Sequence, residues 1–169
     1  PKGSRLISKS TIAIVGGTGR MGKRLAKIFL KKTKRVVVCS RSRAKAEKVA
    51  ATIGASAGLI DEVHDADIVV VTVPPEETFK VCAQVSKKMK RNSLLVDISS
   101  IKMGVADTLA SAVPSGIEYL SVHPLFGPDT RSIVGQNLLF IPVKSGPVSG
   151  VFARFLQDSG LNCFQTTIR

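Results

Sequence analysis

The stretch Thr11-Ile-Ala-Ile-Val-Gly-Gly-Thr-Gly-Arg-Met-Gly22 decides the fold, because a short β-type run leads through glycines into the start of a helix. Its spacing is G-x-G-x-x-G: Gly17 permits a tight turn, Gly19 lets the backbone approach a pyrophosphate, and Gly22 lets the helix pack on the sheet. The free N–H groups and the dipole at the helix start favour an anion. We therefore predict a dinucleotide-binding turn whose cofactor contacts are Gly17, Thr18, Gly19, Arg20, Met21 and Gly22.

Strand-type and helix-type segments alternate along the rest of the chain. Several of the strand-type segments are continuous apolar runs, which is typical of a parallel sheet covered by helices on both faces. We expect an α/β fold, a doubly wound and mostly parallel Rossmann-type sheet, in a single domain at 11–169 after a tail or linker at 1–10. The expected strands are 11–15, 35–39, 68–73, 93–98, 117–122, 138–143 and 162–168, and the expected helices are 20–32, 43–53, 76–89, 101–112 and 148–160.

The composition is that of a globular protein. The 169 residues are 44% apolar and 22% charged, which suffices for one core. No apolar run approaches the length of about 18 residues that a membrane span requires, and the N-terminus lacks the pattern of a signal peptide. Cys39, Cys82 and Cys163 are widely spaced, without CxxC or a histidine cluster, so we expect no disulfide scaffold, no metal site and a cytoplasmic location.

Positive charge is concentrated in the first part of the chain. Residues 1–50 hold 15 Lys and Arg and one acidic residue, Glu47, whereas 51–169 hold 10 basic and 11 acidic residues. This asymmetry indicates an anionic partner or a solvated helix face. A nucleic-acid partner is disfavoured, because Phe29 is the one aromatic residue in the basic part and no helix-turn-helix, zinc-finger or RNA-recognition signature is present. We expect neither a nucleic-acid nor a membrane partner.

The end of the second expected strand indicates which nicotinamide cofactor binds. An NAD-binding unit usually places an acidic residue there for the ribose 2′-hydroxyl, but the chain has no acid between Arg20 and Glu47. Arginine and hydroxyl donors suit a 2′-phosphate, so the sequence predicts NADP, held by Ser40, Arg41, Ser42 and Arg43. Val73 and Pro74 end the third expected apolar strand, where they would line the cofactor or only start a helix.

Polar residues also follow the fourth and fifth expected strands, at the same edge of the sheet. They are Asp97-Ile-Ser-Ser-Ile-Lys102 and the loop His123-Pro-Leu-Phe-Gly-Pro-Asp129. The imidazole of histidine has a pKa of about 6.5 in peptides, so a histidine can act as a general base near neutral pH. We predict that His123 is catalytic and that Ser100 orients it or contacts the substrate, whereas His64 lies in a polar loop and is read as a surface residue.

The glycine turn, the Asp97–Lys102 segment and the His123–Asp129 loop, in this order, resemble the prephenate/arogenate dehydrogenase family of tyrosine biosynthesis. The H-P-[ML]-F-G-P loop is the most specific part of the resemblance. It implies that a nicotinamide cofactor takes hydride from C4 of the cyclohexadienol while a histidine at the position of His123 accepts the C4 hydroxyl proton. CO2 then leaves and the ring aromatises. The resemblance also implies that a serine at the position of Ser100 hydrogen-bonds near this histidine and the nicotinamide.

Family members continue into an all-α domain that dimerises, closes the cleft and supplies an arginine for a substrate carboxylate. We expect that this chain lacks it and is the nucleotide-binding domain, a homodimer only when the helical domain is present. The small-molecule substrate is prephenate or arogenate, and the sequence does not choose between them. Two alternatives stay open: another NADP oxidoreductase, such as a deazaflavin-dependent NADP reductase, and a non-enzymatic module that binds NADP or nucleic acid.

Overall fold

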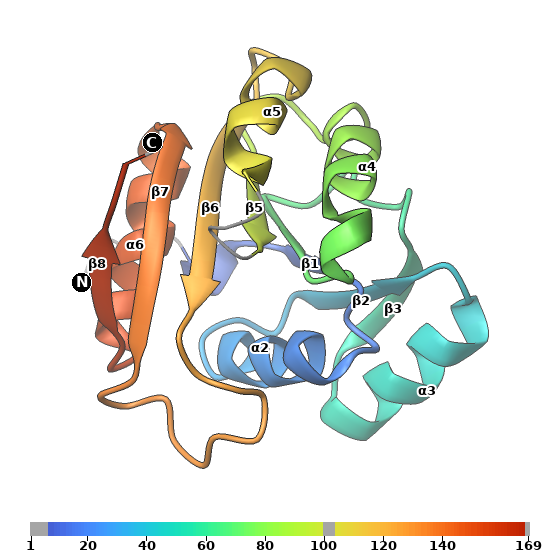
Figure 1. The fold of residues 1–169 in the computed structure, drawn as a ribbon. Helices are drawn as coiled ribbons and strands as arrows, with labels where there is room; N and C mark the ends of the chain where they lie inside the picture. The colour runs from blue at the N-terminus through green and yellow to red at the C-terminus, as the bar shows by residue number, and fades with distance from the viewer. Residues whose placement is uncertain (1–6, 100–103, 168–169) are drawn as a thin grey trace.

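The computed structural model describes residues 7–99 and 104–167 of the chain. Its strands are β1 (Ile12–Val15), β2 (Val36–Ser40), β3 (Ser56–Leu59), β4 (Ile68–Val71), β5 (Leu94–Ile98), β6 (Glu118–Pro124), β7 (Asn137–Lys144) and β8 (Asn162–Gln165). Its helices are α2 (Arg20–Leu30), α3 (Arg43–Ile53), α4 (Pro75–Ser86), α5 (Val105–Ala112) and α6 (Pro147–Asp158). The described residues form one α/β domain (Figure 1).

All eight strands join one sheet in the order β3-β2-β1-β4-β5-β6-β7-β8. Neighbours from β3 to β6 are parallel, β7 runs antiparallel to β6, and β8 is parallel to β7. The order steps outward from β1 in both directions, which is the doubly wound arrangement. The predicted Rossmann-type, mostly parallel sheet is therefore confirmed.

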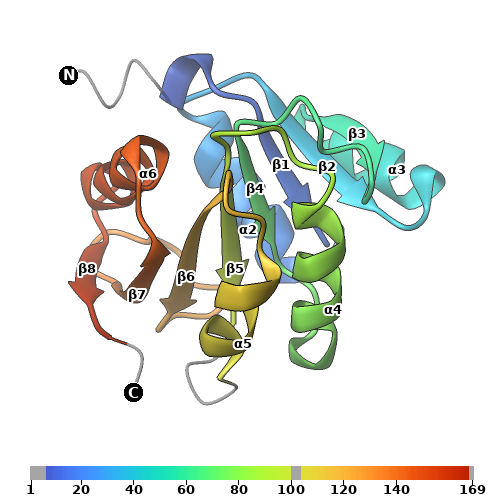
Figure 2. The same cartoon turned by 90° about the horizontal axis from the view of Figure 1, so that it is seen from above.

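Helices cover both faces of this sheet. Figures 1 and 2 show α4 and α5 side by side over one face, where Val81, Val85 and Leu109 pack on the strands. On the other face α2 and α6 meet through Phe29, Phe152 and Phe155, whose ring centroids lie 5.8–6.4 Å apart. The strands between these layers are buried on both sides, which explains why they read as continuous apolar runs.

The sequence prediction missed one strand and displaced several ends. Strand β3 has the sequence Ser-Ala-Gly-Leu and lies at the sheet edge beside β2; tertiary pairing rather than intrinsic β-propensity forms it. Helix α5 begins after Gly104, which has φ +60° and precedes the helix instead of interrupting it. Strand β6 runs through Pro124, so His123 ends a strand and does not lie in the following loop.

Candidate functional site

The carboxyl ends of the parallel strands meet at one rim, and the glycine turn after β1 lies there. Gly16, which the motif analysis left out, is the left-handed residue of this turn, with φ +83°. A Cβ on Gly16 would lie 3.1 Å from the backbone of Thr72, which follows β4. The N–H of Gly16 donates to the Cys39 carbonyl (3.0 Å). The tight turn therefore requires Gly16 as well as the predicted Gly17, whose Cβ would lie 2.9 Å from Ile14 O.

Gly22 holds helix α2 against the turn, as its place in the motif predicts. A Cβ on Gly22 would lie 2.7 Å from Gly16 O and from Gly17 Cα, which is closer than packed atoms allow. Gly19 is the N-cap of α2 and provides no side-chain acceptor for the first N–H groups of the helix. The start of α2 is therefore an uncapped, glycine-lined helix N-terminus, the arrangement that binds phosphate in this class of fold.

A pocket of about 340 Å³ opens beside the turn. Of the residues predicted to contact the cofactor, the pocket is lined by Thr18, Gly19, Ser40, Arg41, Ser42, Val73 and Pro74. The others do not line it: Gly17 and Gly22 form the packed backbone beneath the turn, and Arg20, Met21 and Arg43 lie outside its lining. The lining that motif reasoning missed is Gly16, Lys45, Ile60, Thr72, Glu77 and Val81.

The polar part of this pocket follows strand β2. Ser42 is the N-cap of α3, and its Oγ accepts from the N–H of Lys45 (3.3 Å). The Ser40 Oγ accepts in turn from the N–H of Ser42 (3.3 Å). Two serine hydroxyls, a helix N-terminus and the Lys45 side chain therefore gather where the sequence predicted a phosphate site.

Two carboxylates from later in the chain form ion pairs with the arginines predicted for this site. Arg41 Nη2 lies 2.8 Å from Glu77 Oε1, and Glu77 lines the same pocket from α4. Arg43 pairs with Glu62, which follows β3. The sequence around Arg41 and Arg43 has no acidic residue, but in the folded protein each of these arginines contacts a carboxylate from a later segment.

Farther along the rim, β5 and β6 carry a buried polar network centred on Asp97. The carboxylate has no exposed surface and accepts hydrogen bonds from the hydroxyls of Ser99, Tyr119 and Ser121, the last at 3.1 Å. Burial raises the pKa of the Asp97 carboxyl, and the three hydroxyl donors oppose part of that rise. Burial, followed by the nearby Asp97 charge, also raises the pKa of the Tyr119 hydroxyl, so this group stays a donor.

His123, half-buried at the end of β6, joins this network through the backbone. Its Nδ1 lies 2.9 Å from the carbonyl oxygen of Ser99, the residue that follows β5. Since a carbonyl only accepts, Nδ1 carries the hydrogen, and Nε2 of the neutral ring is left as the acceptor. The other predicted catalytic residue, Ser100, lies outside the described residues.

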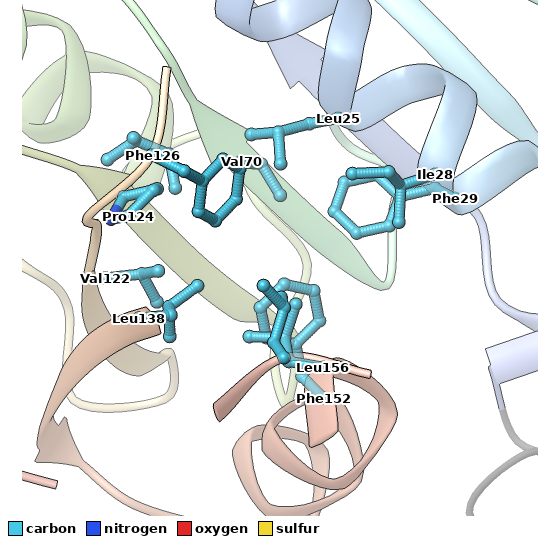
Figure 3. Close-up of a pocket in the computed structure, with 12 residues that line it drawn as sticks. Leu25, Ile28, Phe29, Val70, Val122, Pro124, Phe126, Leu138, Phe152 and Leu156 are labelled. Carbon is cyan, nitrogen blue, oxygen red and sulfur yellow. The ribbon is translucent and has the colours of Figure 1, made fainter. Parts of the chain in front are cut away.

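The loop after His123 is anchored to the apolar core. Figure 3 shows Pro124 and Phe126 at a closed apolar pocket together with Leu25 of α2, and this pocket has room for about one water-sized sphere (≈ 10 Å³). Farther on, Asp129 pairs with Arg20, and Arg24 Nη2 donates to the Thr130 carbonyl (2.7 Å). The loop is thus tied to α2, and the pocket in Figure 3 belongs to the core.

The chain is similar in sequence to one known protein family. The sequence profile of the family described as "Prephenate dehydrogenase, nucleotide-binding domain" matches residues 25–140. The chain belongs to this family. A "Probable arogenate/prephenate dehydrogenase" of Methanocaldococcus jannaschii is 33% identical over 134 residues, which cover 78% of this chain and 30% of that protein. "Arogenate dehydrogenase 1, chloroplastic" of Arabidopsis thaliana is 30% identical over 137 residues, which cover 79% of this chain and 21% of that protein.

Solved structures agree on the fold of this prephenate dehydrogenase nucleotide-binding domain. Arogenate dehydrogenase of Synechocystis superposes with a TM-score of 0.78 at 17% identity, covering 93% of this chain and 59% of that one. An imine reductase of Myxococcus stipitatus in complex with NADP+ reaches 0.71 at 24% identity, with coverages of 94% and 55%. The chain spans less than a third of the two curated relatives above. Within residues 7–99 and 104–167, no helix could cross a membrane and no cluster of metal-ligating side chains occurs.

Proposed function

We propose that this chain is the cofactor-binding and proton-accepting part of an NADP-dependent dehydrogenase. The enzyme oxidatively decarboxylates prephenate or arogenate in the route to tyrosine. The observation that carries this proposal is the Nδ1 contact of His123 with the Ser99 carbonyl, which leaves Nε2 as an acceptor at the rim that also bears the glycine turn. Family membership supports the reaction class.

The cofactor part of the proposal is supported by the shape of the turn. A Cβ on Gly22 would push α2 away from the turn, and the uncapped start of this helix offers free N–H groups, so the site fits a pyrophosphate. The hydroxyls of Ser40 and Ser42 and the cation of Lys45 would hold a 2′-phosphate, with Arg41 exchanging Glu77 for it. When bound, the nicotinamide supplies a hydride acceptor.

His123 does the proton chemistry in this proposal. As the carbon that bears the substrate hydroxyl loses hydride, it becomes carbonyl-like, so its hydroxyl proton has to leave. The Nε2 of His123 accepts that proton, while the Ser99 carbonyl holds Nδ1–H and fixes the ring orientation. Loss of CO2 from the substrate then completes the aromatic ring. We assign Ser100 a contact with His123 and the nicotinamide, as the resemblance implies.

The remaining assignments concern the whole protein. Because the relatives are longer than this chain, we propose that their further length supplies the helical dimerisation domain and the arginine that holds a substrate carboxylate. Residues 11–169 are the cofactor-binding unit, and Ile7, which is fully buried, packs into its core. A cytoplasmic location agrees with Cys39, Cys82 and Cys163 being free thiols.

The test replaces His123 in a polypeptide that joins this chain to the helical region of its relatives. His123→Asn is expected to leave NADP+ affinity unchanged and to slow prephenate or arogenate oxidation by about 10²–10⁴-fold, the usual contribution of a positioned base. The matched control is His64→Asn, since His64 is exposed. Near-normal turnover by His123→Asn would assign the base to another group.

A further inference from the structure

A second pocket, of about 320 Å³, lies away from the cofactor turn, between the C-terminal half of α2 and the 131–134 segment. Five cationic side chains line it: Arg24 and Lys27 on α2, Lys31 and Lys32 at the end of that helix, and Arg131 from the segment opposite. No carboxylate lines it. Its volume is at the lower end of the range for small-molecule sites, about 300–1,000 Å³.

These cations differ from the three arginines predicted to contact the cofactor in having no acidic partner within the described residues. Arg20, Arg41 and Arg43 each pair with a carboxylate. In the part of the chain that the structure describes, by contrast, no ion pair involves any of the five cations of this pocket. The negative end of the helix dipole favours Lys31 and Lys32, but it does not account for the gathering of Arg131 and Arg24 with them.

The walls of the pocket are held in place by hydrogen bonds. Arg24 Nη2 donates to the carbonyls of Thr130 (2.7 Å) and Arg131 (3.3 Å), which fixes the segment that carries the Arg131 side chain. Gly135 N–H donates to Gly160 O (2.8 Å), which ties the same segment to the end of α6. These bonds give the pocket fixed walls on both sides.

The lining also limits the size and kind of anion. Ile28, Ile133 and Val134 give the pocket an apolar side, and Val134 is 69% exposed. Five cations exceed what a single carboxylate requires, whereas a di- or triphosphate carries three or four charges that lysine and arginine bind well. An apolar or ring-shaped group attached to the phosphates would cover the isoleucine and valine side chains.

We propose that this pocket binds a small molecule that carries a di- or triphosphate group, such as a nucleoside triphosphate, at a site separate from the cofactor turn. The ligand phosphates pair with Lys27, Lys31, Lys32 and Arg131. The site does not depend on the dehydrogenase activity proposed above.

The test is calorimetric titration of the 169-residue chain with guanosine triphosphate and with inorganic tripolyphosphate, at about 0.15 M salt. Titrations are run with and without saturating NADP+, so that the cofactor turn is blocked in one arm. One-to-one saturable binding is expected in both arms. Lys31→Gln combined with Arg131→Gln should weaken it at least about tenfold, because two charge-assisted contacts are lost. The matched control, Lys48→Gln with Lys80→Gln, removes two exposed positive charges elsewhere and should change little.

Three results would overturn the proposal. The first is the absence of saturable binding at millimolar phosphate ligand. The second is that both pairs of substitutions weaken binding of the phosphate ligand equally, and that oligothymidylate binds more tightly as its length increases. This would indicate that the overall positive charge of the surface attracts nucleic acid. The third is a parallel loss of NADP+ affinity in the Lys31 and Arg131 variant, because the pocket would then be part of the cofactor site. If NADP+ fails to bind at all, the cofactor proposal fails and the arm without NADP+ still tests this pocket.

Discussion

At the β1–β2 end of the rim the polar side chains are exposed and charged, whereas at the β5–β6 end they are buried and hydrogen-bonded to one another. Arg41 and Arg43 reach across solvent-exposed surface to carboxylates of other segments. Asp97 and Tyr119 are fully buried, and their contacts extend through Ser99 to His123. Exposed ion pairs contribute little to stability, so cofactor preference can change without harm to the fold. The histidine end is part of the core, so a change there costs stability as well.

The largest effect should come from removing the carboxylate at the buried end. Asp97→Ala leaves the hydroxyls of Ser99, Tyr119 and Ser121 without their acceptor, and we expect a loss of about 2–4 kcal/mol in the free energy of unfolding, measured by urea denaturation. Asp65→Ala is the control, because Asp65 is exposed, and it should cost less than about 0.5 kcal/mol. Equal costs at the two positions would contradict the contrast between the two ends.

The glycine turn tests whether the cofactor end also has a rigid part. Gly22→Ala places a methyl group 2.7 Å from Gly16 O, so we expect about 1–3 kcal/mol of destabilisation and at least about tenfold weaker NADP+ binding. Gly150→Ala is the matched control, since Gly150 lies in α6 with nothing near its Cβ position. That control should be neutral or slightly stabilising. If Gly22→Ala bound NADP+ as tightly as the unmodified chain, the close contact between α2 and the turn would not be needed for cofactor binding.

Charge substitutions at the exposed end should alter cofactor preference alone. Arg41→Asp with Arg43→Ala should cost about tenfold to a hundredfold in NADP+ affinity, and should narrow or reverse the preference over NAD+. Glu77→Gln should act in the opposite direction, because it releases Arg41 for the 2′-phosphate. Calorimetry measures both affinities, and thermal unfolding should change little. Equal affinity of the unmodified chain for NADP+ and NAD+ would refute the assignment.

The smallest effect is a dependence of stability on pH that Asp97 alone should carry. Because the pKa of its carboxyl is raised in the folded state, the folded protein favours the protonated form. This contribution is complete below the unfolded-state pKa and is lost as pH rises through the folded-state pKa. The unfolding free energy of the unmodified chain, minus that of Asp97→Asn, should therefore fall as pH rises above the unfolded-state pKa of about 4. A difference that rises with pH would mean that the hydrogen bonds outweigh burial.

Local patterns in the sequence predicted most of this fold. The continuous apolar runs and the glycine spacing predicted a doubly wound, mostly parallel sheet, and the rim position of His123 was inferred from the parallel strands. The short strand β3 was missed because Ser56-Ala-Gly-Leu59 lacks β-branched residues. Thr72, Lys45 and Glu77 carry no local signal of a pocket, since they meet only after the sheet forms. Likewise, the burial of Asp97 depends on hydroxyls from β6, which no spacing in the sequence reveals.

The partner of the His123 Nδ1 is a main-chain oxygen, and this has a consequence for how the site tolerates mutation. Every amino acid at position 99 presents the same carbonyl, so no single side-chain exchange there deletes the acceptor. Mutation of residue 99 therefore leaves the tautomer of the imidazole unchanged. Substitutions farther away, such as those at Asp97, can still change it, because they shift the ends of β5 and β6 relative to each other.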